Sequence, residues 1–202
     1  MQLLKSIFLL GLLSTQSLGK LVPFPRGCGR DVAEETGAKI EARADPPEDR
    51  TFVDLGKNEN ALVGWTLFTK GLFSCVAVVI RSGSDQPEGV IDKILAHVSS
   101  SPCGDEDHPN FEGQMDNIFS KYDEAPIENP QAYVIAPPSN PLFPAQNLFV
   151  AYIQDRCNGK FGSHQKIVRN QHQVNEPGGS RLWIDDTKNV YWGFSDEPIV
   201  RY

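Results

Sequence analysis

The stretch Cys75–Val98, CVAVVIRSGSDQPEGVIDKILAHV, decides the fold of this chain. Residues 75–80 form a short, almost wholly apolar run rich in β-branched side chains, which predicts a strand buried on both faces. Residues 81–89 have the composition of a turn, because they gather glycine, serine, aspartate and proline. Residues 90–98 are predicted to return as a second strand whose side chains alternate between the two faces. The stretch therefore predicts a β-hairpin at the centre of the molecule.

Further elements follow this hairpin in the sequence. Apolar side chains recur at helical spacing over residues 110–123, which predicts one amphipathic helix. A second helix is expected around residues 148–153 and is predicted to close at Asn158-Gly159. Strands are predicted at 62–68, 132–136 and 166–168, and a hairpin at 181–194. Because strands outnumber helices and the helices fall between strands, we predict an α+β (mixed α/β) class.

The N-terminal residues 1–19, MQLLKSIFLLGLLSTQSLG, have the three-part pattern of a cleaved secretory signal. Lys5 supplies the positive charge, a short apolar block follows it, and small residues precede an expected cleavage between Gly19 and Lys20. The apolar block is shorter than the roughly 20 residues that span a bilayer. We therefore expect a secreted, extracellular protein without a membrane span.

Composition divides the remaining chain into two parts. Residues 20–50 are rich in charge, glycine and proline, and we expect a flexible N-terminal arm, with a propeptide as the alternative. Residues 51–202 are predicted to form a single catalytic-type domain, which we expect to be monomeric. The formal net charge of −7 becomes −8 once Lys5 is removed, so no electrostatic attraction to nucleic acid is expected.

The cysteine content leaves two interpretations open. Four cysteines are present: Cys28, Cys75, Cys103 and Cys157. In an oxidising compartment an even number favours two disulfides. If Cys75 instead keeps its thiol, the other three become the disulfide candidates and one of them lacks a partner.

The central hairpin brings a cysteine and a histidine together. Cys75 and His97 have their midpoint at Gln86, inside the predicted turn, so a symmetric hairpin sets the two residues opposite one another. Facing Cβ atoms in such a pair lie about 4.5 to 5.5 Å apart. An imidazole at that spacing can activate a thiol as a nucleophile. We therefore take Cys75 and His97 as the candidate catalytic pair.

The segment 69–79, TKGLFSCVAVV, together with the LAHV at 95–98, resembles the catalytic core of the Cys–His glutamine deamidases. That group includes the chemotaxis receptor deamidase CheD and the catalytic domain of the cytotoxic necrotizing factors. The match covers residues 69–98, and the order of the later elements is similar. The resemblance implies β-sandwich-like sheets with two or more flanking helices.

The same resemblance implies site residues and a reaction. Cys75 would be the nucleophile, His97 the base, and Thr69 the residue that orients the imidazole. Backbone N–H groups of Ser74 and Cys75 would form the oxyanion site. The implied reaction converts glutamine to glutamate through a thioester, without cofactor or metal, on a protein substrate that can belong to another organism. Phe73 departs from the family, which prefers a small residue there, and is expected to narrow the site or alter the turn.

Two other functions fit the same residues. One is a non-enzymatic secreted binding protein or effector, in which Cys75 is disulfide-bonded and the tryptophan-bearing hairpin at 181–194 meets a partner. The other is a Cys–His protease or acyltransferase. The acidic loop at 105–108, DEDH, is expected to be solvated rather than metal-binding, since four adjacent loop residues rarely point at one centre.

Overall fold

The computed structural model describes residues 50–99, 110–142, 144–169, 180–193 and 195–202. The expected signal at 1–19, nearly all of the expected arm at 20–50, Cys28, Cys103 and the acidic loop at 105–108 lie outside the described residues. Arg50, which closes the expected arm, begins the first strand.

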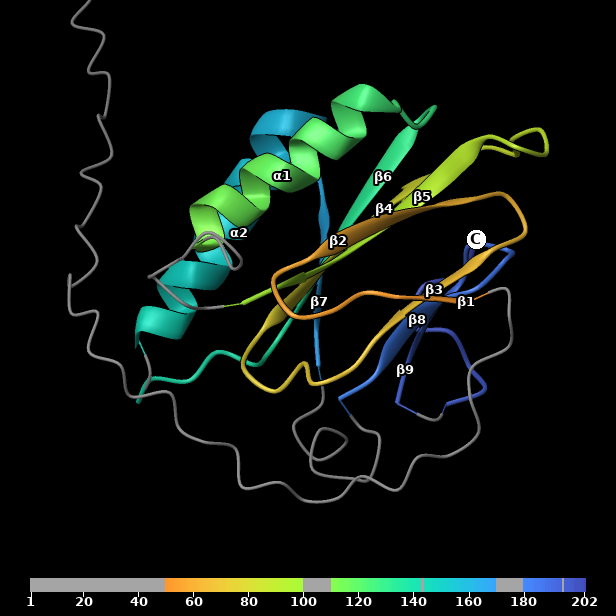
Figure 1. Ribbon diagram of the computed structural model, residues 1–202. Coiled ribbons are helices and arrows are strands. Elements are labelled where there is room, and N and C mark those ends of the chain that lie inside the picture. Colours follow the sequence, from red (N-terminus) through yellow and green to blue (C-terminus); the bar gives the residue numbers. More distant parts are fainter. Residues whose placement is uncertain (1–49, 100–109, 143, 170–179, 194) are drawn as a thin grey trace, which may run out of the picture.

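The described residues form two helices and two mixed sheets, which confirms the predicted α+β class. The larger sheet has the strand order β2 (Asn58–Leu62), β5 (Ile91–Val98), β4 (Val76–Ser82), β6 (Pro130–Ala136) and β7 (Gln165–Val168). The smaller sheet has the order β1 (Arg50–Phe52), β3 (Thr66–Thr69), β8 (Leu182–Ile184) and β9 (Val190–Trp192). Helices α1 (Phe111–Glu124) and α2 (Pro144–Phe161) lie on one side of the larger sheet, and the smaller sheet lies on the other (Figure 1).

Strand β4 is the centre of this three-layer arrangement. All seven of its residues are buried, as the apolar run at 75–80 predicted. Alternation divides its side chains between two cores: Val76 and Val78 pack toward the helices, whereas Ala77 and Val79 pack toward the smaller sheet. The layer between the two sheets is therefore a closed apolar core, and the candidate pair belongs to its edge.

Helix α1 forms where the apolar spacing predicted it. The side-chain oxygen of Asn110 accepts a hydrogen bond from the Gly113 N–H at 2.9 Å and caps the N-terminus. The buried stripe includes Phe111, Met115 and Ile118 and packs against the large sheet. This stripe supplies much of the core on the helix side.

Two predicted boundaries are wrong. Residues 62–68 do not form one strand, because Gly64 turns the chain with φ +89°, and strands β2 and β3 join different sheets. Helix α2 does not end at Asn158-Gly159 but at Phe161, followed by Gly162 with φ +72°. One glycine inside a helix costs only about 1 kcal/mol, and the ring of Phe161 packs edge-on against α1 aromatic rings, which offsets that cost.

The predicted C-terminal hairpin is confirmed as β8 and β9. On the outer face of the smaller sheet, four aromatic side chains stand in register across its four strands: Phe52, Phe68, Trp183 and Tyr191. The rings of Trp183 and Tyr191 are stacked with their centroids 5.1 Å apart. None of these four side chains belongs to either core.

Charged side chains are buried at the opposite end of β4 and β5 from Cys75 and His97. Arg81 is 2% exposed and donates to the hydroxyl of Tyr133 and to the carbonyl of Arg201, both at 2.9 Å, and also to the carbonyl of Lys188. Its guanidinium thus ties the C-terminal residues to the large sheet. Neither helix in the described ranges is long and apolar enough to cross a membrane.

Candidate active site

Three strands bring Thr69, Cys75 and His97 to one end of the space between the sheets. Thr69 is the last residue of β3, Cys75 directly precedes β4, and His97 is the seventh residue of β5. Thr69 is 0% exposed, His97 2% and Cys75 9%. The three residues that the deamidase resemblance named therefore share a buried environment, although they come from both sheets.

The hairpin register corrects one prediction: His97 lies opposite Ala77, and not opposite Cys75. Val76 pairs with Val98, so the hairpin centres on Pro87 rather than Gln86. The loop is not symmetric, because Ser82 still belongs to β4 whereas Val90 lies outside β5. A shift of two residues preserves the face, so Cys75 becomes a diagonal neighbour of His97, where Cβ atoms lie within about 7 to 8 Å.

A chain of hydrogen bonds fixes the imidazole of His97. The Thr69 hydroxyl donates to the carbonyl oxygen of Val53 at 2.7 Å. Because a threonine hydroxyl has one hydrogen, its oxygen must accept the second bond, from Nδ1–H of His97 at 2.9 Å. This network assigns the Nδ1–H tautomer and leaves the lone pair of the ring on Nε2.

Burial keeps this imidazole neutral. Desolvation lowers the pKa of His97 to about 4, the nearby charge of Asp54 opposes this shift, and the charge of Arg169 adds to it. Nε2 is buried and makes no hydrogen bond to any residue in the described ranges. A buried acceptor without a partner is uncommon in a folded protein, and this lone pair is where the ring can accept a proton during a reaction.

The two described cysteines are separated by the large sheet. Cys75 belongs to the core between the sheets, whereas Cys157 belongs to the core under the helices. They form no disulfide with one another, and the sheet between them prevents it. Cys157, a disulfide candidate from the sequence, is 0% exposed, and burial raises the pKa of its thiol to about 12.

The turn before Cys75 runs close to the imidazole. Gly71 has φ +80°, and a Cβ placed on it would lie 3.9 Å from Cε1 of His97. The N–H of Phe73 donates to the Gly71 carbonyl at 2.8 Å. The N–H groups that follow it along the turn are those of Ser74 and Cys75, the expected oxyanion donors. The side chain of Phe73, which was expected to narrow the site or alter the turn, is 52% exposed.

Arg169 was not predicted as a site residue from the sequence. This residue follows β7 and is 4% exposed, and its Nη2 donates to the carbonyl oxygen of Cys75 at 2.8 Å and to that of Phe73 at 3.2 Å. Its guanidinium carbon lies 5.2 Å from the ring centroid of Trp192. The parallel pairing of β6 and β7 brings it to this place, and the only sequence signal was an arginine directly after a predicted strand.

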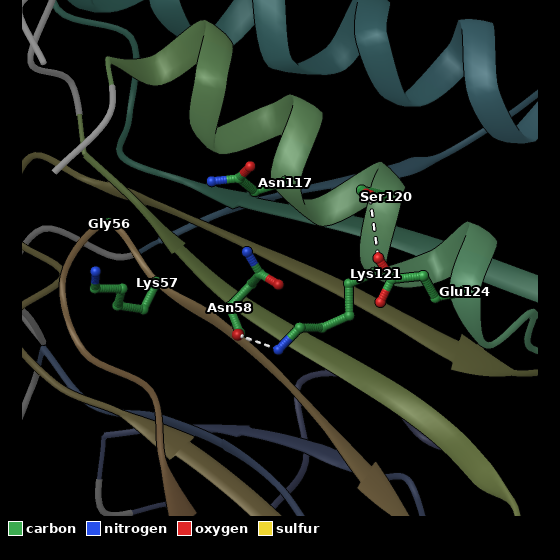
Figure 2. Close-up of a pocket in the computed structure, with 7 residues that line it drawn as sticks. All are labelled: Gly56, Lys57, Asn58, Asn117, Ser120, Lys121 and Glu124. Atoms are coloured by element: carbon green, nitrogen blue, oxygen red, sulfur yellow. Dashed lines mark hydrogen bonds between the residues drawn. The ribbon is translucent and has the colours of Figure 1, made fainter. Parts of the chain in front are cut away.

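A separate polar pocket lies between β2 and α1 (Figure 2). Its volume is about 260 Å³, and in it the Lys121 ammonium donates to the carbonyl of Asn58 at 2.7 Å. The pocket is lined by Gly56, Lys57, Asn58, Asn117, Ser120, Lys121 and Glu124. None of the candidate catalytic residues is among them, so the pocket is not part of the Cys–His site.

The chain was compared with known proteins. No protein-family model matches it, and no match is found among curated proteins either. A functional assignment therefore depends on the geometry around Cys75 and His97.

Proposed function

We propose that this protein is a Cys–His amidohydrolase, and specifically a secreted protein glutamine deamidase. The observation that supports this most is the Val53–Thr69–His97 chain of hydrogen bonds, at 2.7 and 2.9 Å, which leaves Nε2 of His97 as the proton acceptor. Cys75 lies on the same face of the large sheet as His97. An oriented base on the same face of a sheet as a thiol is compatible with nucleophilic catalysis.

In the proposed reaction, Nε2 of His97 takes the proton of the Cys75 thiol as sulfur attacks the carboxamide carbon of a glutamine side chain. Backbone N–H groups of Ser74 and Cys75 hold the negative oxygen of the tetrahedral intermediate. His97 then returns the proton to the nitrogen, the C–N bond breaks, and ammonia leaves a thioester on Cys75. Water, deprotonated by His97, hydrolyses this thioester to glutamate and restores the thiol.

The test is to incubate the mature protein with glutamine-rich proteins and to measure ammonia together with amide-to-acid conversion by mass spectrometry. Cys75→Ala and His97→Ala are expected to release no ammonia above background. Cys157→Ala is the matched control, because it removes a thiol from the other core, and it should keep the activity as long as it folds. Peptide cleavage or acyl transfer without ammonia would instead favour a Cys–His protease or acyltransferase.

A binding protein is the second candidate, and the aromatic row on the outer face of the smaller sheet favours it. Phe52 is 40% exposed, and the nearby Trp65 is 44% exposed. In this alternative Cys75 is held in a disulfide and the outer face meets a partner. Peptide mapping without reductant separates the two candidates, because a disulfide-linked Cys75 peptide would remove the nucleophile.

A further inference from the structure

The guanidinium of Arg169 is buried without a complete set of partners. Its side chain is 4% exposed, and Nε and Nη1 make no hydrogen bond in the described part of the chain. No carboxylate of the described residues forms an ion pair with it. Because an arginine keeps its charge in proteins, burying it without an anion is strongly unfavourable. Within the described residues, Nε and Nη1 of this guanidinium are therefore open to a negatively charged group.

The contacts of Arg169 place its charge at the turn that carries the candidate nucleophile. Nη2 holds the carbonyl oxygens of Cys75 and Phe73 at 2.8 and 3.2 Å. The ring of Trp192 lies against the guanidinium and restricts its position. Arg169 therefore binds the backbone of the residue that carries the thiol. A negative charge on the sulfur of Cys75 raises the pKa of the Arg169 guanidinium and opposes the lowering effect of burial.

Among His97, Asp54 and Arg169, only Arg169 is positively charged at neutral pH. From β5, His97 is neutral because burial lowers its pKa to about 4. From the segment after β1, Asp54 is negative and acts on His97. From the segment after β7, Arg169 keeps its charge, since its pKa is lowered only to about 10.

We propose that Arg169 is a positioning residue that supplies the positive charge for the thiolate of Cys75 and fixes the 73–75 turn. This inference rests on the proposed function in taking Cys75 as the nucleophile. It adds a fourth residue to the site and separates two tasks. Arg169 stabilises the deprotonated sulfur, whereas the neutral His97 accepts and returns protons.

The test is the pH dependence of Cys75 alkylation by iodoacetamide, followed by peptide mass spectrometry on the mature protein without substrate. The midpoint in the wild type should lie below the ordinary thiol value of about 8.5. Arg169→Gln should raise that midpoint by about one pH unit or more, as expected for the loss of an adjacent opposite charge. Arg156→Gln, which removes a half-buried arginine ion-paired with Asp116 on the helix side of the large sheet, should leave it unchanged.

Two further measurements distinguish a lost role of Arg169 from misfolding of the variant. Cys157 reacts only if the fold opens, so its alkylation reports misfolding of a variant in the same sample. If Arg169→Gln does not fold, the wild-type midpoint alone decides, and a value of about 8.5 or above overturns the inference. An unchanged midpoint in folded Arg169→Gln, or a larger rise in His97→Asn than in Arg169→Gln, also overturns it.

The outcome is independent of the deamidase assay. A shifted midpoint without ammonia release from any glutamine-bearing protein would keep the role of Arg169 and contradict the deamidase proposal. Ammonia release that depends on Cys75, with an unchanged midpoint in Arg169→Gln, would keep the deamidase and contradict the role of Arg169.

Discussion

Replacing Thr69 by valine removes one hydroxyl and keeps the shape of the side chain. The hydroxyl donates to Val53 and accepts from His97, and all three residues are buried. The change leaves one buried carbonyl and one buried N–H without their partner. Each such group costs about 1 to 3 kcal/mol, so we expect Thr69→Val to lower the free energy of unfolding by about 2 to 6 kcal/mol.

The same substitution should also affect catalysis, because Nδ1–H of His97 loses the acceptor that fixes its tautomer. We expect ammonia release by the folded variant to fall by more than about tenfold, as orienting residues in nucleophile–base systems contribute at least this much. Urea unfolding measures the stability, and ammonia release at saturating substrate measures the catalytic effect.

Two variants complete this experiment. Thr69→Ser keeps both hydrogen bonds and loses one methyl group, so it should cost only about 1 kcal/mol and keep most of the activity. Thr66→Val removes a hydroxyl from the opposite face of the same strand and should not affect His97. A Thr69→Val protein with wild-type stability and wild-type ammonia release would show that the Thr69 hydroxyl does not hold the imidazole of His97.

Four further outcomes are expected. Burial lowers the pKa of His97 from its ordinary 6.5 to about 4 in the folded protein. The neutral imidazole therefore stabilises the fold fully above pH 6.5, and the free energy of unfolding should fall by about 3 kcal/mol as the pH decreases to 4. The unfolding free energy of His97→Asn should lack this part of the pH dependence. Gly71→Ala should cost about 1 to 2 kcal/mol in a thermal or urea unfolding experiment, because Gly71 has φ +80°. Arg81→Met should lower the free energy of unfolding by about 3 kcal/mol or more, because it leaves buried acceptors unpaired. Ammonia release by the folded fraction should stay unchanged, because Arg81 pairs with Lys93, four residues from His97 along β5. The Cys157 thiol, with its pKa raised to about 12, should resist iodoacetamide at pH 8 in the native protein and react only after unfolding.

The central hairpin could be predicted because its signal is local. The run at 75–80 is apolar on both faces, and the structure buries every residue of β4. The predicted register was wrong by two residues, since loop symmetry is not encoded in the strand pattern. The predicted face is nevertheless correct. Side chains alternate with a period of two, so a shift of two residues leaves Cys75 and His97 on the same face of the sheet.

The long-range part of the site could not be predicted from local patterns. Arg169 reaches a carbonyl 94 positions away in sequence, through the parallel pairing of β7 with β6. Thr69 was named only through the resemblance to the deamidases, and no periodicity identifies its hydrogen bond to His97. The turn at Gly64 could not be predicted, because glycine is compatible with both a strand and a turn and the residues around it in 62–68 are mostly apolar.

The proposed deamidation requires Cys75 to form a covalent bond with its substrate. The direct measurement is to mix the mature protein with an active glutamine-bearing substrate, quench with acid, and map the cysteine-containing peptides by mass. We predict an acyl adduct on Cys75, none on Cys157, and a longer-lived adduct in His97→Asn if that variant still acylates. Full ammonia release by Cys75→Ala, or an active protein in which Cys75 is recovered in a disulfide-linked peptide, would contradict the account.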